Sequence, residues 1–238
     1  NEAAWGFSWE HVRAAFSSYY LGNYAPVQIL SYMLDYDLWG LKAGGFLFNN
    51  IVIHAANGVL VYWLLIRWYG DRLIALFASA LFLLHPVQVE SVAWISQRKT
   101  LLAMLFFLLA WERYCHYREA PSGEGKLAYA MSVSAFVLSL LSKSMTVVFP
   151  VVLVLYDLCF PEGGRRLRLK DKAPFVIAAC IVAALAFHSQ LPQFDGGRTD
   201  FHGGSPVATF FSMLPVFCRY LGMLVWPARL SADYDPPI

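Results

Sequence analysis

A short polar segment between two apolar runs constrains this 238-residue chain more than any other feature. The segment, 85–99 (HPVQVESVAWISQRK), carries His, Glu, Arg and Lys, and apolar runs at 73–84 and 100–111 flank it. Charged groups are costly in hydrocarbon, so a charged segment between two apolar, membrane-compatible segments is expected at the membrane–water interface. The pattern therefore predicts two helices that meet at one face of a membrane.

The composition extends this prediction to the whole chain. Hydrophobic residues make up 58% and charged residues 14% of the sequence, and the mean hydropathy is +0.51. Soluble domains carry about 25% charged residues, so lipid must solvate much of this chain. We expect an all-α, polytopic membrane helical bundle whose partner is the lipid bilayer. The net charge of +2, with no basic cluster interleaved with aromatics, argues against a nucleic-acid partner.

Three parts follow along the chain. Residues 1–43 predict two short amphipathic helices, one starting at Trp9 and one between Pro26 and Gly40, that lie in the headgroup layer on the outer side. Residues 44–190 predict a transmembrane bundle of about six spans. Residues 191–238 predict an outer loop followed by an interfacial or membrane-dipping helix, with a true span at 206–226 as the alternative.

Residues 127–159 are apolar throughout except at Ser142-Lys143-Ser144. As one helix they would be about 50 Å long, against about 30 Å of hydrocarbon. A hairpin of two short spans that turns at Lys143 is therefore expected.

Positive charge near short loops marks the cytoplasmic side. Under this threading, ten of the 18 Lys and Arg residues share one side: Arg67, Arg72, Arg113, Arg118, Lys126, Arg165, Arg166, Arg168, Lys170 and Lys172. The segments 1–43, 85–99, 142–144 and 191–205 then lie together on the non-cytoplasmic side.

Three cations stand on that side against the bias. Arg98, Lys99 and Lys143 either bind an anion, such as a lipid phosphate, or extend to water and headgroups at the ends of their spans.

A polar face runs along the first span. Asn50, His54 and Asn57 are spaced i, i+4 and i+7, which places them on one side of a helix. This face should point into the bundle, either to bond neighbouring helices or to contact substrate.

Acidic and cysteine residues complete the candidates. Glu90 could be a general base, a salt-bridge partner of Arg98, or a metal ligand with His85, although this set is too sparse for zinc. Asp35 begins a D-x-D of the kind that holds divalent cations with sugar nucleotides, but i and i+2 diverge on a helix. No metal site is therefore predicted, and a divalent cation stays open. The four cysteines lack C-x-x-C spacing and are expected to be buried small hydrophobes: Cys115, Cys159, Cys180 and Cys218.

Motifs for other chemistries are missing from the sequence. It contains no GxxxxGK[ST], no GxSxG and no HExxH, which argues against soluble nucleotide and hydrolase chemistry.

At these residues the sequence resembles a known family. HPVQVESVAWISQRKTLLAMLFFLLA (85–110) resembles the pattern HPxHxESVAWxxxRKxxL of bacterial relatives of the transmembrane-and-tetratricopeptide-repeat (TMTC-like) O-mannosyltransferases. Four further blocks resemble the same family in the same order: PVQILSYMLDYDLWGL (26–41), FLFNNIVIHAAN (46–57), LLSKSMTVVFPVVLVLYD (140–157) and YLGMLVWPARLSADYDPP (220–237). Gln88 replaces the second His and Ser144 replaces a Pro or acid, so the match is incomplete around both motifs.

The resemblance implies a membrane glycosyltransferase of the GT-C type. Such an enzyme moves a sugar, here mannose or another hexose, from a polyprenyl-phosphate donor to a protein or glycan acceptor on the non-cytoplasmic side. In a bacterium this side of the inner membrane faces the periplasm. The resemblance also implies an acidic catalytic base before Asn1 and repeats after Ile238. With no initial methionine, the chain is expected to be a piece of a longer protein that is inactive alone.

The resemblance assigns roles by position. Glu90 and His85 match an outer-loop catalytic motif, Arg98 and Lys99 match its Arg-Lys, and Lys143 matches a Leu-Ser-Lys motif. The expected mechanism is an in-line displacement in which the cations stabilise the departing lipid phosphate and Glu90 orients them or helps to deprotonate the acceptor. The alternatives are a transporter or flippase of lipid-linked or anionic solutes and a noncatalytic membrane scaffold.

Overall fold

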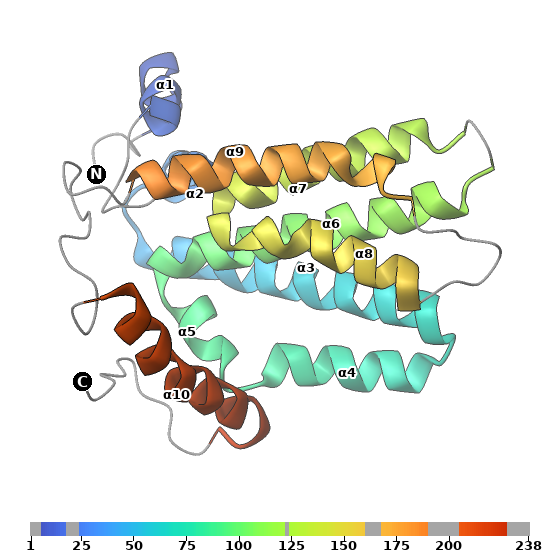
Figure 1. The fold of residues 1–238 in the computed structure, drawn as a ribbon. Helices are drawn as coiled ribbons and strands as arrows, with labels where there is room; N and C mark the ends of the chain where they lie inside the picture. Colours follow the sequence, from blue (N-terminus) through green and yellow to red (C-terminus); the bar gives the residue numbers. More distant parts are fainter. Residues whose placement is uncertain (1–5, 18–23, 122–123, 160–167, 190–204, 228–238) are drawn as a thin grey trace.

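The computed structural model describes residues 6–17, 24–121, 124–159, 168–189 and 205–227, and within these ranges every regular element is a helix. The prediction of an all-α membrane helical bundle is confirmed. The helices, drawn in Figure 1, are α1 (Trp9–Ser17), α2 (Pro26–Trp39), α3 (Ala43–Tyr69), α4 (Arg72–Leu84), α5 (Gln88–Ala93), α6 (Arg98–Glu119), α7 (Lys126–Ser142), α8 (Phe149–Cys159), α9 (Ala173–Ser189) and α10 (Pro206–Val225). Short 3-10 turns lie at η2 (Ile95–Gln97), η3 (Ser144–Val148) and η5 (Lys170–Lys172).

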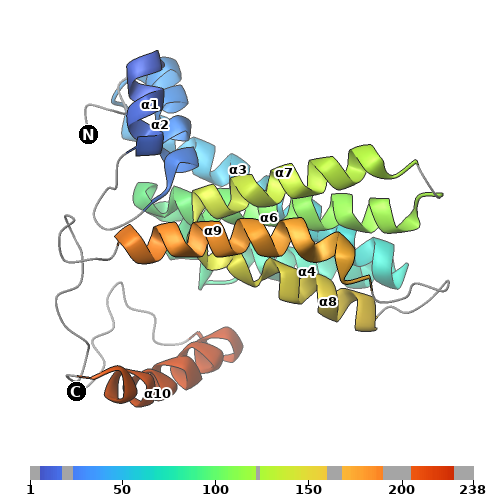
Figure 2. The ribbon, with the colours of Figure 1, turned by 45° about the horizontal axis from the view of Figure 1, so that its top comes forward.

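The core forms where α6, α7, α8 and α9 run side by side, as Figures 1 and 2 show. Aromatic side chains fill it. The rings of Phe136 and Phe149 stack at 4.9 Å between centroids, and Phe175 packs against both at 5.6 Å. Large buried rings contribute strongly to packing, so this cluster fixes the arrangement of the four helices.

Helices α3 and α4 approach each other through a glycine. The Ser79 hydroxyl donates to the Gly58 carbonyl at 2.7 Å, and a Cβ on Gly58 would lie 2.6 Å from the Leu83 side chain. Small residues permit this close contact between membrane helices. Helix α3 ends at Gly70, whose φ of 69° is the left-handed conformation that commonly closes a helix.

The region 127–159 is a helical hairpin, as the sequence predicts, because α7 ends before Lys143 and α8 begins at Phe149. Two boundaries differ from the prediction. The segment 85–99 contains α5 and η2 instead of a plain loop, and α6 continues past residue 111 to Glu119. The extension is tolerated because its charges are paired: Glu112 forms an ion pair with Arg67 at 3.2 Å.

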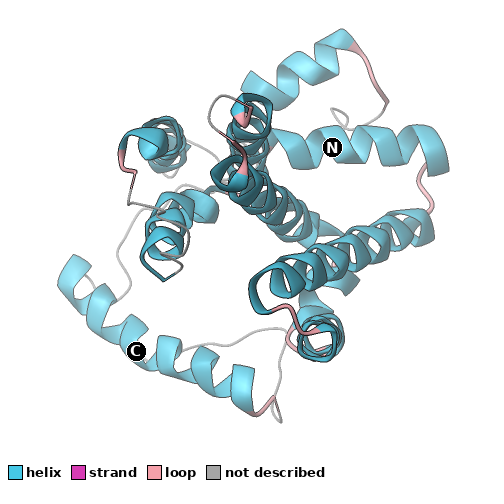
Figure 3. Ribbon diagram, turned by 90° about the vertical axis from the view of Figure 1, so that its right-hand side faces the viewer, coloured by secondary structure: helices cyan, strands magenta, loops and turns pink. Residues whose placement is uncertain are grey.

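In the part of the chain that the structure describes, three helices are long and apolar enough to cross a membrane, namely Ala43–Tyr69, Lys170–Ser189 and Val207–Val225, and three apolar helices are shorter. The last of these long helices lies within α10. From the sequence, this region was predicted to be an interfacial or membrane-dipping helix, with a true span as the alternative. Figures 2 and 3 show α10 at the margin of the bundle. Its large apolar side chains are exposed, and near its end the Leu224 carbonyl lies 3.1 Å from His85.

The two ends of the bundle carry different segments. Helices α1, α2 and α5 and the turn after α7 gather at one end, where α3 and α6 begin (Figure 1). The turns α3–α4 and α6–α7 lie at the other end. Contacts given below bring α2, the segment 85–99 and Lys143 together at one end of the bundle; that this end faces the non-cytoplasmic side stays a prediction. The predicted outer loop 191–205 lies outside the described residues except for Ser205, as do Arg165 and Arg166.

The prediction of four buried cysteines is wrong for three of them. Cys115 is buried, but Cys159, Cys180 and Cys218 are exposed, and all four carry free thiols. The three exposed cysteines lie on outward helix faces, where a bilayer accepts a small apolar side chain without burial in protein.

Candidate functional site

Four polar side chains form a continuous hydrogen-bonded chain at the end of the bundle that carries α5. The Lys143 ammonium donates to Thr100 Oγ1 at 2.9 Å, and the Thr100 hydroxyl donates to Gln97 Oε1 at 3.0 Å. Gln97 Nε2 then donates to Glu90 Oε1 at 3.0 Å. The chain joins the turn after α7 to the start of α6 and to α5, so it brings Glu90 and Lys143 into one site.

The charges of this site influence one another. The pKa of Lys143 lies below its ordinary value, first because the ammonium is partly desolvated and then because Lys99 repels it, while Glu90 acts in the opposite direction. Lys99 and Lys143 are half-buried and Glu90 is exposed. The site thus presents two cations and one carboxylate close together, a charge pattern suited to an anionic ligand.

Arg98 lies next to this site but faces into the protein. Its side chain is 1% exposed, and its Nη1 pairs with Asp35 Oδ2 at 2.5 Å. Its Nε donates to Asn50 Oδ1 and its Nη2 to the Phe46 carbonyl, both at 2.6 Å. The guanidinium carbon also lies 5.4 Å from the centroid of the Tyr32 ring. Arg98 therefore has no surface for a lipid phosphate, and it joins α2 to α3 and α6 instead.

This pairing corrects two interpretations. Arg98 pairs with Asp35, so the hypothesis that Glu90 is its partner is wrong. The two acids of the D-x-D also separate, because Asp35 is buried and accepts from Asn49 at 2.6 Å, whereas Asp37 is exposed and accepts from the Phe7 amide at 3.4 Å. A joint cation site at the D-x-D is therefore absent, for the geometric reason that i and i+2 diverge on a helix.

Helix α2 also holds the backbone that precedes α6. The Tyr32 hydroxyl donates to the Ile95 carbonyl at 2.6 Å, and Gln28 Nε2 donates to the Ser96 carbonyl at 2.9 Å. Sequence reasoning missed Gln28, Tyr32, Gln97 and Thr100. Gln28 and Tyr32 share one face of α2 at i and i+4, which is the signal that would have indicated a common partner.

The polar face of α3 points into the bundle, as predicted. Asn50 and Asn57 are fully buried and His54 is 7% exposed. Asn50 donates to the Val92 carbonyl at 3.0 Å, Asn57 to the Leu101 carbonyl at 3.1 Å, and His54 Nε2 contacts the Leu83 carbonyl at 3.1 Å. These contacts bond α3 to three neighbouring segments. A substrate contact by the same residues stays a prediction.

The hydrogen bonds of His85 go to backbone groups and not to Glu90. One ring nitrogen, Nε2, lies 3.1 Å from the Leu224 carbonyl on α10, and the other accepts from the Val87 amide at 3.3 Å. His54 and His85 both line an apolar cavity of about 310 Å³ between α3, α4 and α5. With both ring nitrogens in contact with the backbone, His85 has no lone pair free for a cation.

The described residues offer no set of metal ligands. Within the described parts of the chain, no group of three or more His, Cys, Asp or Glu side chains is close enough to hold a metal ion. The divalent cation that the sequence left open therefore remains a prediction without a set of ligands.

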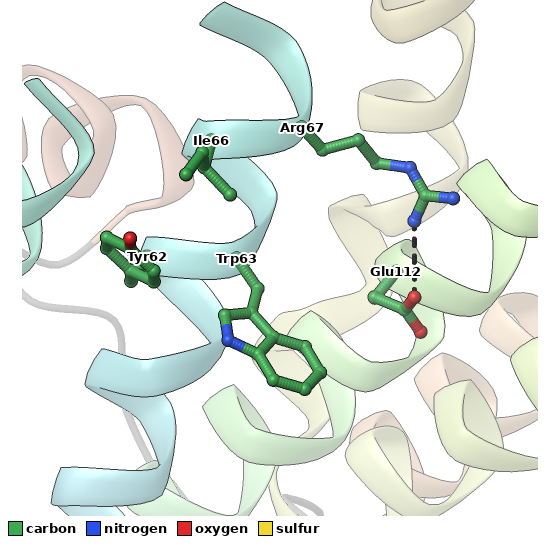
Figure 4. A pocket seen from close by; sticks show the side chains of 5 residues that line it. All are labelled: Tyr62, Trp63, Ile66, Arg67 and Glu112. Carbon is green, nitrogen blue, oxygen red and sulfur yellow. Dashed lines mark hydrogen bonds and ion pairs between the residues drawn. The ribbon is translucent and has the colours of Figure 1, made fainter. Parts of the chain in front are cut away.

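The other end of the bundle carries a separate pocket of about 280 Å³. Figure 4 shows Arg67 extending from α3 toward Glu112, and Tyr62, Trp63 and Ile66 on the last turns of α3 also line this pocket. Arg67 also pairs with Glu119 at 2.7 Å. Its guanidinium is thus held by carboxylates, and the pocket lacks the surplus of positive charge seen near Lys143.

A buried ion network lies further into that end. Asp157 accepts from Arg118 and from Lys172, both at 2.6 Å, and these three side chains are almost fully buried. The network ties α6 to α8 and to the start of α9. It was not anticipated from the sequence, where Arg118 and Lys172 were counted only as cytoplasmic charges.

Fold and site together define an all-helical membrane bundle with a cluster of two lysines and a glutamate at one end. Comparison with known proteins agrees with this class. The chain is 24% identical over 244 residues to the human protein O-mannosyl-transferase TMTC3, an alignment that covers 89% of this chain and 26% of that protein. It is 28% identical over 232 residues to Tmtc2 of Drosophila melanogaster, covering 90% of this chain and 24% of the relative.

A shorter alignment, to TMTC1 of Mus musculus, is 32% identical over 151 residues and covers 59% of this chain and 16% of the relative. The chain spans about a quarter of the length of the first two relatives. No protein-family model and no solved structure matches it.

Proposed function

We propose that this chain is the part of a membrane glycosyltransferase that holds the donor phosphate. The donor is a polyprenyl-phosphate sugar, with mannose as the first candidate, and the acceptor is a protein hydroxyl. The observation that carries the proposal is the cluster of Lys99, Lys143 and Glu90 at one end of the bundle. The similarity to proteins named O-mannosyl-transferases supports the choice of sugar and reaction.

The chemistry follows from the charges. The acceptor oxygen forms a bond to the anomeric carbon while the bond from that carbon to the phosphate oxygen breaks, and the phosphate leaves with the bonding electrons. Lys99 and Lys143 stabilise the negative charge that develops on the leaving phosphate. Glu90 is exposed and lies beside these cations, so we assign it the acceptance of the hydroxyl proton.

Arg98 and Asp35 act indirectly in this proposal. Because Arg98 is buried against Asp35 and Asn50, it holds the start of α6 in place and so positions Lys99. In this proposal Lys99 and Lys143, not Arg98, contact the donor phosphate.

We also propose the setting of the reaction. The bundle belongs to the GT-C type, and the end that carries α1, α2 and α5 faces the non-cytoplasmic side. In a bacterium this is the periplasmic side of the inner membrane. The asymmetric distribution of Lys and Arg supports this orientation.

The test is transfer of mannose from a polyprenyl-phosphate donor to an acceptor protein by the full-length protein in lipid nanodiscs, read by mass spectrometry. We expect Lys143→Gln and Lys99→Gln each to lower turnover about 100-fold or more, the effect of removing one charge-stabilising group. Lys126→Gln is the matched control, because Lys126 is exposed at the opposite end of the bundle, and it should leave turnover unchanged.

Full turnover in both site variants would overturn the role of the lysines. Passage of the lipid-linked sugar across liposomes without transfer would indicate the transporter alternative. Transfer to a glycan in place of a protein would change the acceptor and leave the donor site intact.

A further inference from the structure

The direction of every hydrogen bond between Lys143 and Glu90 is determined by the two charged ends. The Lys143 ammonium can only donate, so Thr100 Oγ1 must accept from it at 2.9 Å. The Thr100 proton is then left to bond Gln97 Oε1 at 3.0 Å. At the other end a carboxylate can only accept, so Gln97 must turn its amide nitrogen toward Glu90.

The Gln97 amide has no alternative orientation. Rotating it by half a turn would place its oxygen against the Glu90 carboxylate and its nitrogen against Thr100. The first contact would be repulsive because both groups would be acceptors. The two ends of the chain therefore agree on a single arrangement, in which each donor points from the cation toward the anion.

A series of hydrogen bonds that all point in one direction is stronger than the same bonds taken separately. Bonds that point in one direction polarise one another, and here a full positive charge stands at the start and a full negative charge at the end. The chain also spans three separately folded segments: the turn after α7, the junction of η2 with α6, and α5. It therefore fixes the distance and direction between groups that the fold alone brings together only approximately.

The bonds still leave both ends able to react. Lys143 has three ammonium protons and gives one to Thr100, and Glu90 has a second oxygen beyond the one bound by Gln97. Lys143 is half-buried and Glu90 is exposed.

We infer that Thr100 and Gln97 are positioning residues that hold the Lys143 ammonium against the departing phosphate and the Glu90 carboxylate against the acceptor. This inference rests on the proposed function and adds to it the residues that align its two charged groups. The two positioning residues touch neither substrate. They keep the cation and the carboxylate a fixed distance apart, so that bond breaking and proton acceptance occur at the same reacting centre.

The first test measures Lys143 directly and needs no transfer activity. Chemical acetylation of the full-length protein in nanodiscs is followed at Lys143 by peptide mass spectrometry across a range of pH. The neutral amine reacts, so the midpoint of the pH profile reports the pKa. Thr100→Val removes an acceptor from the ammonium, which disfavours the charged form. We expect the midpoint to fall by about 0.5 to 1 pH unit.

Two variants control for a merely structural effect. Thr100→Ser keeps the hydroxyl and should keep the wild-type midpoint. Thr146→Val removes a hydroxyl that donates to the Lys143 backbone carbonyl at 3.1 Å, and this bond lies outside the chain, so the midpoint should not move. Lys99 and Glu90, the other charged groups that act on Lys143, are unchanged in all of these variants.

The second test uses transfer by the full-length protein. Thr100→Val and Gln97→Leu should each lower kcat about 10- to 100-fold with little change in KM for the donor, because alignment matters most in the transition state. The two losses should not simply multiply in the double variant, because breaking either link already uncouples Lys143 from Glu90. Thr100→Ser should restore kcat.

The two tests separate the inference from the proposed function. An unchanged acetylation midpoint in Thr100→Val would overturn the positioning role. So would a double variant whose loss of kcat equals the product of the two single losses. If the wild-type protein transfers no sugar while the midpoint shifts as expected, the proposed function fails and the inferred alignment of a catalytic pair fails with it. If the wild type transfers and the midpoint does not shift, only the inference fails.

Discussion

The buried pair of Arg98 and Asp35 gives the sharpest test of the site. The two side chains are 1% and 2% exposed and their charged atoms lie 2.5 Å apart. Removing one partner of such a pair leaves an uncompensated buried charge, which costs about 3 to 5 kcal/mol of folding free energy. Arg98→Met should therefore destabilise the chain by at least that amount, because it also takes donors from Asn50 and from the Phe46 carbonyl. Asp35→Leu should cost a similar amount.

A double-mutant cycle isolates the pair itself. The lost bonds to Asn50 and Phe46 are common to the two variants that carry Arg98→Met, so they cancel in the coupling energy. Since each single variant strands a charge and the double variant strands none, we expect a coupling energy of about 3 kcal/mol, at the upper end of the usual range. The assay is reversible unfolding of the chain in mixed detergent micelles, followed by circular dichroism.

The cycle also distinguishes the two roles considered for Arg98. A phosphate-binding arginine would leave the unfolding free energy unchanged when substituted and would weaken donor binding instead. A coupling energy below about 0.5 kcal/mol, within the additivity expected of independent sites, would refute the argument that Arg98 joins α2 to the bundle.

Two further predictions concern the packing of α3, with unfolding free energy as the measurement in both. Asn57→Leu should cost about 0.5 to 1.5 kcal/mol because it removes the buried hydrogen bond from the Asn57 amide to the Leu101 carbonyl, and Val59→Ala, at an exposed position, should cost less; equal losses would contradict the role of the buried amide. Gly58→Ala should cost about 1 to 3 kcal/mol because its Cβ would overlap the Leu83 side chain. Gly44→Ala, with open space around it, is the matched control, and a stable Gly58→Ala would show that α3 and α4 can separate without cost.

Much of the fold could be predicted because the bilayer imposes it. The apolar runs and the polar breaks between them mark where helices begin and end, since hydrocarbon leaves the backbone few alternatives. The hairpin at Lys143 followed from length alone. The continuation of α6 to Glu119 did not, because it depends on the ion pair between Arg67 and Glu112, which no local spacing reveals.

The candidate site was predicted in its members more than in their roles. The sequence indicated that Glu90, Lys99 and Lys143 share one face of the membrane, and the structure brings them together. The sequence did not indicate that Asp35 neutralises Arg98, because the two residues are distant in the chain and ion pairs between helices follow no periodic pattern. Counting Arg98 as a free cation beside a membrane therefore overstated the positive charge available to a ligand.

Neighbouring residues at the start of α6 have different roles. Successive side chains on a helix point about 100° apart, so Arg98 can turn inward to Asp35 while Thr100 bonds Lys143. If this division is correct, Arg98→Met should lower sugar transfer although Arg98 touches no substrate, because loosening α2 displaces Lys99 and Thr100 together. The loss should appear in kcat more than in KM, and Asp35→Leu should produce the same loss. A variant of Asp35 that transfers at the wild-type rate while Arg98→Met does not would show that Arg98 acts on the donor directly.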